Sequence, residues 1–179
     1  MQDHAIALTS CGWVEAAASG RVKVLDFPKR RKKGIRSLGP GSIVLVACRK
    51  EGIGAVITGE LLVKEVRKLY SGTYRRLARK GLIYEPQELK PREYVWAIIF
   101  EDFIKYPREV PQSELSDVRT STSHKPLSEW LLIGLTYIKS EDSHVIDKVR
   151  SKAGVLGYLM RKLRELESRL DQLQGLLRR

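Results

Sequence analysis

The sequence of 179 residues predicts an α+β fold: a small, mainly antiparallel β-sheet or barrel with a few flanking helices, followed by a C-terminal helix. Three observations predict it. Residues 42–48 and 54–61 are rich in β-branched side chains and are joined by a short glycine-containing connection, which is typical of a β-hairpin. Residues 94–100 are apolar on both faces of a strand, which indicates a central strand. Leucines recur every three or four residues from 156 to 177, which indicates a long helix.

The first elements follow from local composition. Residues 4–8 predict a short strand. The Ala-rich segment 12–19 predicts a helix that Thr9 and Ser10 can cap and that Gly20 ends. Residues 22–27 alternate loosely between apolar and polar side chains, and we expect a second strand there.

The second half of the chain contains longer polar stretches. Residues 63–80 are strongly basic, and we expect a helix or loop outside the sheet. Pro107 and Pro111 are expected to end the central strand, because proline cannot donate to a strand ladder. Residues 113–118 predict a helical turn, and residues 130–138 a last apolar strand.

Positive charge is concentrated in the first half of the chain. The net charge is +12, and the 17 basic and 6 acidic residues up to Lys80 contribute +11 of it. Between Lys29 and Lys50 there are eight Lys or Arg residues and no Asp or Glu, so a polyanion is the expected partner. The residues predicted to contact a phosphate backbone are Lys29, Arg30, Arg31, Lys32, Lys33, Arg36, Arg49 and Lys50.

No residue pattern predicts a metal site, a cofactor or catalysis. The three histidines and two cysteines lack metal-ligand spacing, and the glycine turns match no nucleotide-binding motif. The sequence leaves open whether Cys11 and Cys48 form a disulfide. We expect a cytoplasmic protein without a membrane segment, because neither a signal-peptide pattern nor a long apolar run is present.

The C-terminal leucines predict a separate unit, residues 145–179, after a domain of residues 1–144. Leucine occupies both core positions of a heptad pattern, which favours a coiled coil and a homodimer. Packing of this helix onto its own domain is the alternative. The residues predicted to form the dimer are Leu156, Leu159, Leu163, Leu166, Leu170, Leu173 and Leu177.

Several motifs occur in an order that resembles a known family. An opening strand, polar turn and Trp-bearing helix stand in HAIALTSCGWVEAAASG, and a basic loop before a turn and strand stands in FPKRRKKGIRSLGPGSIVLV. A further strand follows in GIGAVITGEL, a long strand ending in prolines in YVWAIIFEDFIKYPREVP, and a closing segment in EWLLIGLTYI. Over about residues 4–140 this order resembles the EVE domain of the PUA-like superfamily, which is related to YTH and ASCH domains.

This resemblance implies a pocket at the end of a barrel that accepts a flipped or modified base of RNA or DNA, while the basic surface holds the phosphate backbone. Leu25 and Asp26 stand where the family usually has a Trp-Gly pair. By position, the residues expected to form the base pocket are Thr9, Ser10, Trp13, Leu25, Asp26 and Trp130.

Plainer interpretations remain open. Trp13 and Trp130 are also typical core residues, and Thr9 and Ser10 are typical helix caps. An ASCH-like enzyme that acts on modified nucleosides, using Asp26 or the two hydroxyls, is one functional alternative. An assembly protein that recruits another coiled coil is the other.

Overall fold

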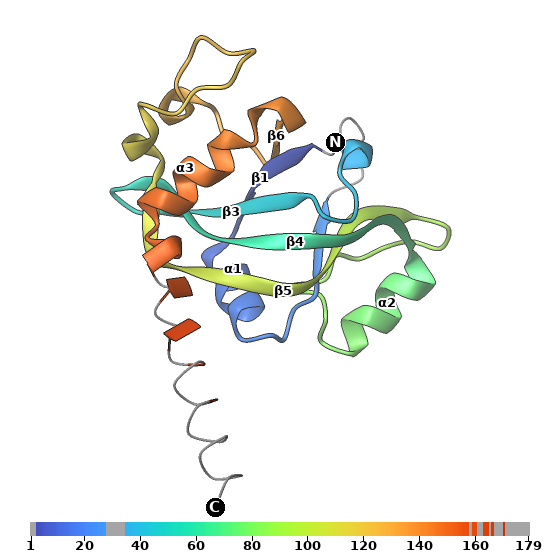
Figure 1. Cartoon of the computed structure of the whole chain (residues 1–179). Helices are drawn as coiled ribbons and strands as arrows, with labels where there is room; N and C mark the ends of the chain where they lie inside the picture. The colour runs from blue at the N-terminus through green and yellow to red at the C-terminus, as the bar shows by residue number, and fades with distance from the viewer. Residues whose placement is uncertain are drawn as a thin grey trace, which may run out of the picture.

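A computed structural model describes residues 3–27 and 35–157, together with residues 159, 160, 163, 164, 166 and 170. Six strands form one sheet in the order β2-β5-β4-β3-β1-β6 (Figure 1). All neighbouring strands are antiparallel except β1 and β3, which are parallel. The strands are β1 (His4–Thr9), β2 (Val24–Phe27), β3 (Ile43–Lys50), β4 (Gly54–Tyr70), β5 (Tyr94–Pro111) and β6 (Leu135–Ile138).

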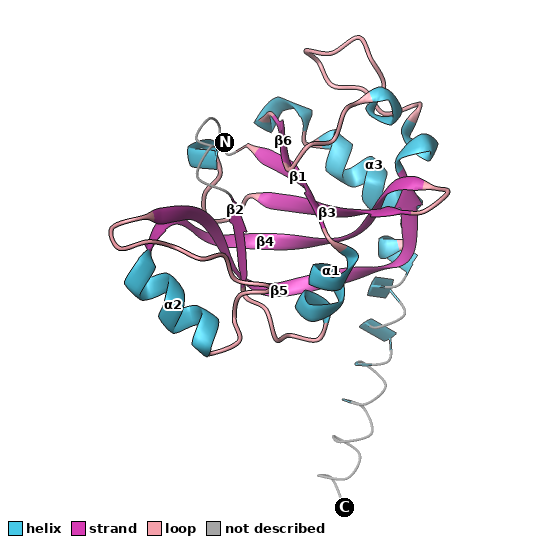
Figure 2. Cartoon of the chain, turned by 180° about the vertical axis from the view of Figure 1, so that it is seen from behind, coloured by secondary structure: helices cyan, strands magenta, loops and turns pink. Residues whose placement is uncertain are grey.

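In the continuous described ranges, 3–27 and 35–157, the helices that flank the sheet are α1 (Cys11–Ala18), α2 (Ser71–Arg79) and α3 (His144–Lys152). In Figure 1 α3 lies in front of the sheet, whereas the view from behind in Figure 2 brings α1 to the front. Short 3-10 turns occur at Ile35–Ser37, Gln112–Leu115, Leu127–Glu129 and Ser140–Asp142. Ser10 caps α1 as predicted, because its Oγ accepts the Trp13 N–H at 3.1 Å.

The two faces of the sheet carry different parts of the core, because successive side chains of a strand point to opposite faces. On one face, Trp13 of α1 belongs to the same buried cluster as Val46 of β3. On the other face, Val149 of α3 shares a cluster with Leu45, the neighbour of Val46. A third cluster, which includes Tyr74, lies under α2.

A buried ion pair fastens α3 to the sheet. Glu60 of β4 is 5% exposed, and Arg150 donates to it from Nε at 2.8 Å and from Nη2 at 2.6 Å. The Tyr106 hydroxyl donates to the same carboxylate at 2.7 Å. Burial and the neighbouring carboxylate hold the pKa of Tyr106 above its usual value, so its hydroxyl remains a donor. Each Glu60 oxygen thus has a partner.

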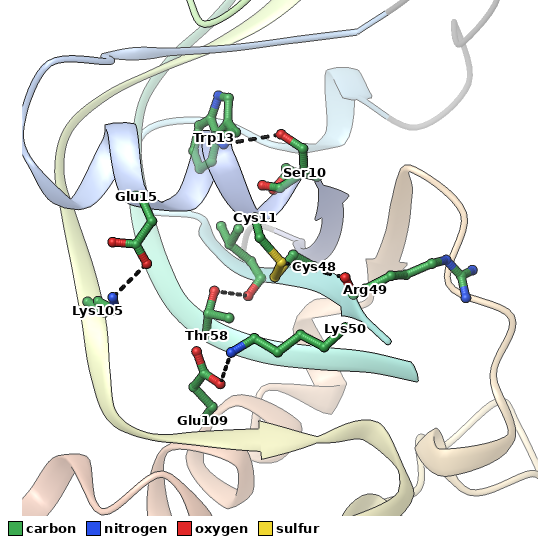
Figure 3. The surroundings of a disulfide bond; sticks show 12 residues. Ser10, Cys11, Trp13, Glu15, Cys48, Arg49, Lys50, Thr58, Lys105 and Glu109 are labelled. Atoms are coloured by element: carbon green, nitrogen blue, oxygen red, sulfur yellow. Dashed lines mark hydrogen bonds and ion pairs between the residues drawn. A yellow bond between two sulfur atoms is a disulfide. The ribbon is translucent and has the colours of Figure 1, made fainter. Parts of the chain in front are cut away.

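A disulfide joins α1 to the end of β3. Cys11 and Cys48 are bonded, with their Cα atoms 5.2 Å apart (Figure 3). The Cys11 sulfur also lies 3.6 Å from the Arg49 carbonyl oxygen. This is a contact rather than a hydrogen bond, because a disulfide sulfur carries no proton. The bond holds the first residue of α1 against β3, next to Arg49.

The predicted hairpin is confirmed by the antiparallel pairing of β3 and β4. Its glycines adopt positive φ, with 73° at Gly52 and 90° at Gly54. The predicted central strand is confirmed as well, since β5 is paired on one side with β2 and on the other with β4. The α+β class and the mainly antiparallel sheet are therefore as expected.

The prediction for residues 63–80 was wrong in its first half. The chain continues as β4 up to Tyr70, and only then forms α2. Val63 and Leu69 are buried, whereas the charged residues between them are mostly exposed. The strand forms because its backbone pairs with β5, a partner that local composition does not reveal.

Two strand boundaries also differ from the prediction. Pro107 does not end β5, because it lies between Lys105 and Val110, where the pairing with β4 shifts register and no regular ladder bond needs its missing N–H. The last strand begins at Leu135 rather than at residue 130. Residues 130–134 belong to no registered strand pairing, although the Gly134 carbonyl oxygen accepts the Leu8 N–H at 2.6 Å, and Ile133 is 52% exposed.

Candidate functional site

A pocket opens where the two edges of the curled sheet approach each other. One wall comes from Leu25, Asp26 and Phe27 of β2, which is one edge strand. The facing wall comes from residues 8–10 at the end of β1 and residues 132–134 just before β6, the other edge strand. The cavity volume is about 450 Å³. We call this cavity the seam pocket.

The seam pocket brings together most of the residues that were predicted to contact a base. Its lining includes Thr9, Ser10, Trp13, Leu25 and Asp26, together with Arg49. Trp130 is not part of this lining in the described part of the chain. Its indole Nε1 donates to the Lys125 carbonyl oxygen at 3.2 Å, and the ring packs against the cluster under α3.

Trp13 forms an apolar wall of the pocket. It is 4% exposed, and its ring packs on Phe100 at 5.7 Å and on Phe103 at 6.1 Å between centroids. Its indole N–H is buried and has no acceptor among the described residues. Trp13 is therefore a core residue and a pocket residue at once.

The two hydroxyl residues shape the turn between β1 and α1. The Thr9 hydroxyl donates to the Ser10 carbonyl oxygen at 3.1 Å, and Ser10 Oγ accepts the Trp13 N–H. Ser10 is exposed and Thr9 is half-buried, so both also border the cavity. Helix capping and a place in the pocket are compatible here.

The Asp26 carboxylate is held by two donors from outside the pocket. Its Oδ2 accepts from the Tyr74 hydroxyl at 2.8 Å and from Gln87 Nε2 at 2.8 Å. Burial raises the pKa of Tyr74, and the Asp26 carboxylate adds to this, so the hydroxyl stays protonated and donates. The backbone N–H of Gln87 in turn donates to the Tyr74 oxygen at 2.9 Å.

Local sequence reasoning missed the rim formed by Tyr84, Glu85 and residues 132–134. The Tyr84 hydroxyl lies over α1 at Gly12, where a Cβ atom would collide with it. Partial burial and the neighbouring Glu85 raise the pKa of Tyr84. A glycine inside an Ala-rich helix was the available signal, since it indicates close approach of another group.

The predicted phosphate-contacting cations have different surroundings. Arg49 lines the seam pocket and donates to the Leu132 carbonyl oxygen at 3.3 Å. Lys50 instead forms an ion pair with Glu109 at 2.5 Å, and Figure 3 shows the two cations pointing different ways. The Arg36 guanidinium lies 5.3 Å from the centroid of the Trp96 ring. The residues Lys29, Arg30, Arg31, Lys32 and Lys33 lie outside the described residues.

No three His, Cys, Asp or Glu side chains in the described part of the chain form a group that could hold a metal ion. No helix in that part of the chain has the length and apolar character needed to cross a membrane.

Comparisons with known proteins give matches among solved structures only. No protein-family model matches the chain, and no curated protein does. ASCH from Zymomonas mobilis matches with a TM-score of 0.57 and 15% identity, over 82% of this chain and 94% of that chain. A mutant of that protein matches with a TM-score of 0.59 and 13% identity, over 82% and 97%.

The N-terminal domain of Staphylothermus marinus McrB also matches, with a TM-score of 0.51 and 13% identity, over 81% of this chain and 93% of that chain. At such identities the likeness shows the fold alone. The predicted PUA-like fold is thereby confirmed, as a curled mixed sheet that forms a half-barrel. The matches do not single out the EVE family within it.

Proposed function

We propose that the chain is a nucleic-acid-binding module that takes one base of RNA or DNA, flipped or modified, into the seam pocket. One observation carries this proposal: two separate segments bring Thr9, Ser10, Trp13, Leu25 and Asp26 to one cavity, and a third places Arg49 beside them. Its volume lies within the range of about 300–1,000 Å³ that is typical of small-molecule sites.

The chemistry of the walls supports a base as the occupant. Trp13, Leu25 and Phe27 offer apolar surface, and the hydroxyls of Thr9, Ser10 and Tyr84 stand among polar groups that could read a base edge. Arg49 places a positive charge at the same cavity, where the phosphate of a flipped nucleotide would need one. Extruding a base costs a few kcal/mol, which stacking and edge hydrogen bonds can offset.

Catalysis has less support. The Asp26 carboxylate already accepts two hydrogen bonds on one oxygen, which suits a fixed structural or recognition role. An ASCH-like enzyme would need this group, or the two hydroxyls of the β1–α1 turn, to act on the substrate. We therefore put binding first.

We also propose that the leucine-rich tail pairs with the tail of a second copy. Residues up to Val155 are packed in the core, as Ala153 and Val155 show with 0% and 7% exposure. The described leucines beyond them, Leu156, Leu159, Leu163, Leu166 and Leu170, are 50–71% exposed. Leu173 and Leu177 lie outside the described residues. Such an apolar stripe needs a partner, because an isolated helix is only marginally stable in water.

The binding proposal is tested by measuring the affinity for single-stranded RNA and DNA by fluorescence anisotropy at several salt concentrations. Affinity should fall steeply with salt, because each phosphate contact adds about 0.7 to the slope of log K against log salt for a single strand. Arg49→Ala should weaken binding to every sequence and lower the slope by about this amount.

Lys50→Ala is the matched control. It removes the same charge from the next residue, but Lys50 is already paired with Glu109, so affinity should change much less. Affinity that stays flat with salt would contradict nucleic-acid binding. If the two substitutions weakened affinity equally, the seam pocket would not be part of the nucleic-acid interface.

A further inference from the structure

Aromatic rings and cations alternate along one face of β4 and β5. The Tyr70 and Tyr94 rings are 5.6 Å apart, and Lys68 Nζ lies 4.5 Å from the centroid of Tyr94 and 5.5 Å from that of Trp96. Arg36, from the 3-10 turn Ile35–Ser37, also lies over Trp96, with its Cζ 5.3 Å from the ring centroid. We call these five residues, Tyr70, Tyr94, Lys68, Trp96 and Arg36, the stacking ladder.

Strand register explains why these side chains share a face. Tyr70 pairs with Tyr94 across the two strands, and Lys68 pairs with Trp96, two residues along. Leu69, the residue between the two β4 members, points to the opposite face, where it is buried with Tyr74 of α2. Figure 1 shows α2 following directly from the end of β4. One face of this end of the sheet is therefore covered by a helix, and the ladder is on the other.

Four members of the stacking ladder reach solvent, and two of them are cations: Tyr70 is 54% exposed, Arg36 is exposed, and Lys68 and Tyr94 are half-buried. Trp96 is buried, with 8% exposure, and Lys68 and Arg36 lie over its ring. No carboxylate of the described residues forms an ion pair with Lys68 or Arg36. Exposed tyrosines beside such cations match the requirements of a polyanion that carries flat rings.

The ladder is also continuous with the seam pocket. Phe27 lines that pocket, and in the pairing of β2 with β5 it stands opposite Trp96. A chain that leaves the pocket over Phe27 would therefore meet first Arg36 and Lys68, which lie over the Trp96 ring, and then Tyr94 and Tyr70.

We propose that the stacking ladder binds the unpaired nucleotides that flank the base in the seam pocket. This inference rests on the proposed function. Bases stack on Tyr70 and Tyr94, while the phosphates between them lie near Lys68 and Arg36. Stacking on aromatic rings tolerates any sequence, because every base has a π-face, so the ladder adds affinity without choosing a sequence. The partner is single-stranded RNA or DNA, since a duplex keeps its bases stacked on one another.

The test compares single strands of about 12 nucleotides with the same sequence as a duplex and with single nucleoside monophosphates. Tyr70→Ala should weaken binding of the single strand on the order of tenfold. Affinity for the duplex and for the monophosphates should stay within twofold of the wild-type protein. Tyr70→Phe keeps the ring and should restore single-strand binding.

Ile53→Ala is the control for loss of an exposed side chain. Ile53 is 56% exposed, close to the value for Tyr70, and lies in the turn at the opposite end of β4, so its replacement should leave affinity unchanged. Circular dichroism should show that all variants are folded, since each altered side chain is more than half exposed.

The outcomes separate the two proposals. Wild-type affinity of Tyr70→Ala for single strands, together with weak binding by Arg49→Ala, would overturn the proposal for the stacking ladder and support the proposal for the seam pocket. Equal weakening by Tyr70→Ala and Tyr70→Phe would overturn ring stacking. If the unaltered protein binds no single strand, both proposals fail.

Discussion

His4 connects the first strand to its parallel neighbour through its side chain. Its Nδ1 accepts the Ile43 N–H at 3.0 Å, which requires that this nitrogen carry no proton. Burial holds the pKa of His4 below the ordinary value of 6.5; Asp3 opposes this shift, and Arg150 adds to it. The folded protein therefore disfavours the charged form of this residue.

This lowered pKa predicts a pH dependence of stability. As the pH falls below 6.5, the unfolded chain binds a proton at His4 before the folded chain does, so stability decreases until the pH has passed the folded pKa. Above 6.5 the contribution is constant. Thermal midpoints between pH 5 and 8 should therefore fall less on the acid side for His4→Asn, whose amide oxygen can still accept.

The matched control is the exposed His124, and His124→Asn should keep the acid-side slope of the wild-type protein. If His4→Asn also kept that slope, the buried imidazole would not be its source.

Single residues of the site differ in how far the sequence could predict them. Local rules placed Ser10 at a helix cap and Trp13 in the helix, because a cap and the first turn of its helix are neighbours in the chain, but family resemblance assigned both to the pocket. Asp26 was assigned by family resemblance, and its bonds to Tyr74 and Gln87 come from elements that no local pattern connects to it. Tyr84 reaches the pocket from the segment after α2 and lies over Gly12 of α1, and no local pattern connects these two segments.

At the scale of elements, the long pair of β4 and β5 depends on a point where the two backbones nearly touch. At Gly59 an added Cβ would collide with the Ile104 carbonyl oxygen and would lie 2.6 Å from Phe103 Cζ. The pairing shifts register on both sides of this residue, as expected where a strand bends. The glycine is therefore needed for space.

Gly59→Ala should lower the free energy of unfolding by about 1–3 kcal/mol, because backbone has to move to accommodate the methyl group. Gly72→Ala is the control: Gly72 lies in α2 with nothing within 4 Å, so alanine should stabilise the protein by about 0.4–1 kcal/mol. Urea unfolding measures both changes. A destabilisation by Gly72→Ala as large as that by Gly59→Ala would contradict this explanation.

Elements with a clear apolar period were predicted well, and those that depend on a distant partner were not. The hairpin of β3 and β4 was recognised because its turn glycines and β-branched runs are local. The second half of β4 was missed because its charges conceal a strand that only β5 stabilises. The last strand was predicted too long, since the apolar residues before Leu135 line the pocket rim instead of a ladder.

At the scale of the whole molecule, the exposed leucines of the tail predict a dimer. Light scattering of the full chain should give twice the mass of one copy, and removal of the residues after Gly157 should give a folded monomer, because the core ends at Val155. Leu163→Glu should also weaken the dimer. Arg164→Glu, an exposed position outside the leucine stripe, should not.

A full chain that stays monomeric at all concentrations would contradict self-pairing. That result would favour a different coiled coil as the partner of the tail. The domain without its tail should still bind a single nucleotide, because none of the described tail residues lines the seam pocket.

The absence of strand pairing between β2 and β6 in the described part of the chain affects the size of ligand that the seam pocket can bind. In a closed barrel, backbone hydrogen bonds between every pair of neighbouring strands fix the diameter of the barrel. Here the two edge strands are not paired with each other in the described part of the chain. Only side chains and loops therefore set the width of the opening. A larger ligand can widen the gap without breaking a hydrogen bond between strands. Its extra size should therefore cost less binding free energy than it would inside a closed barrel.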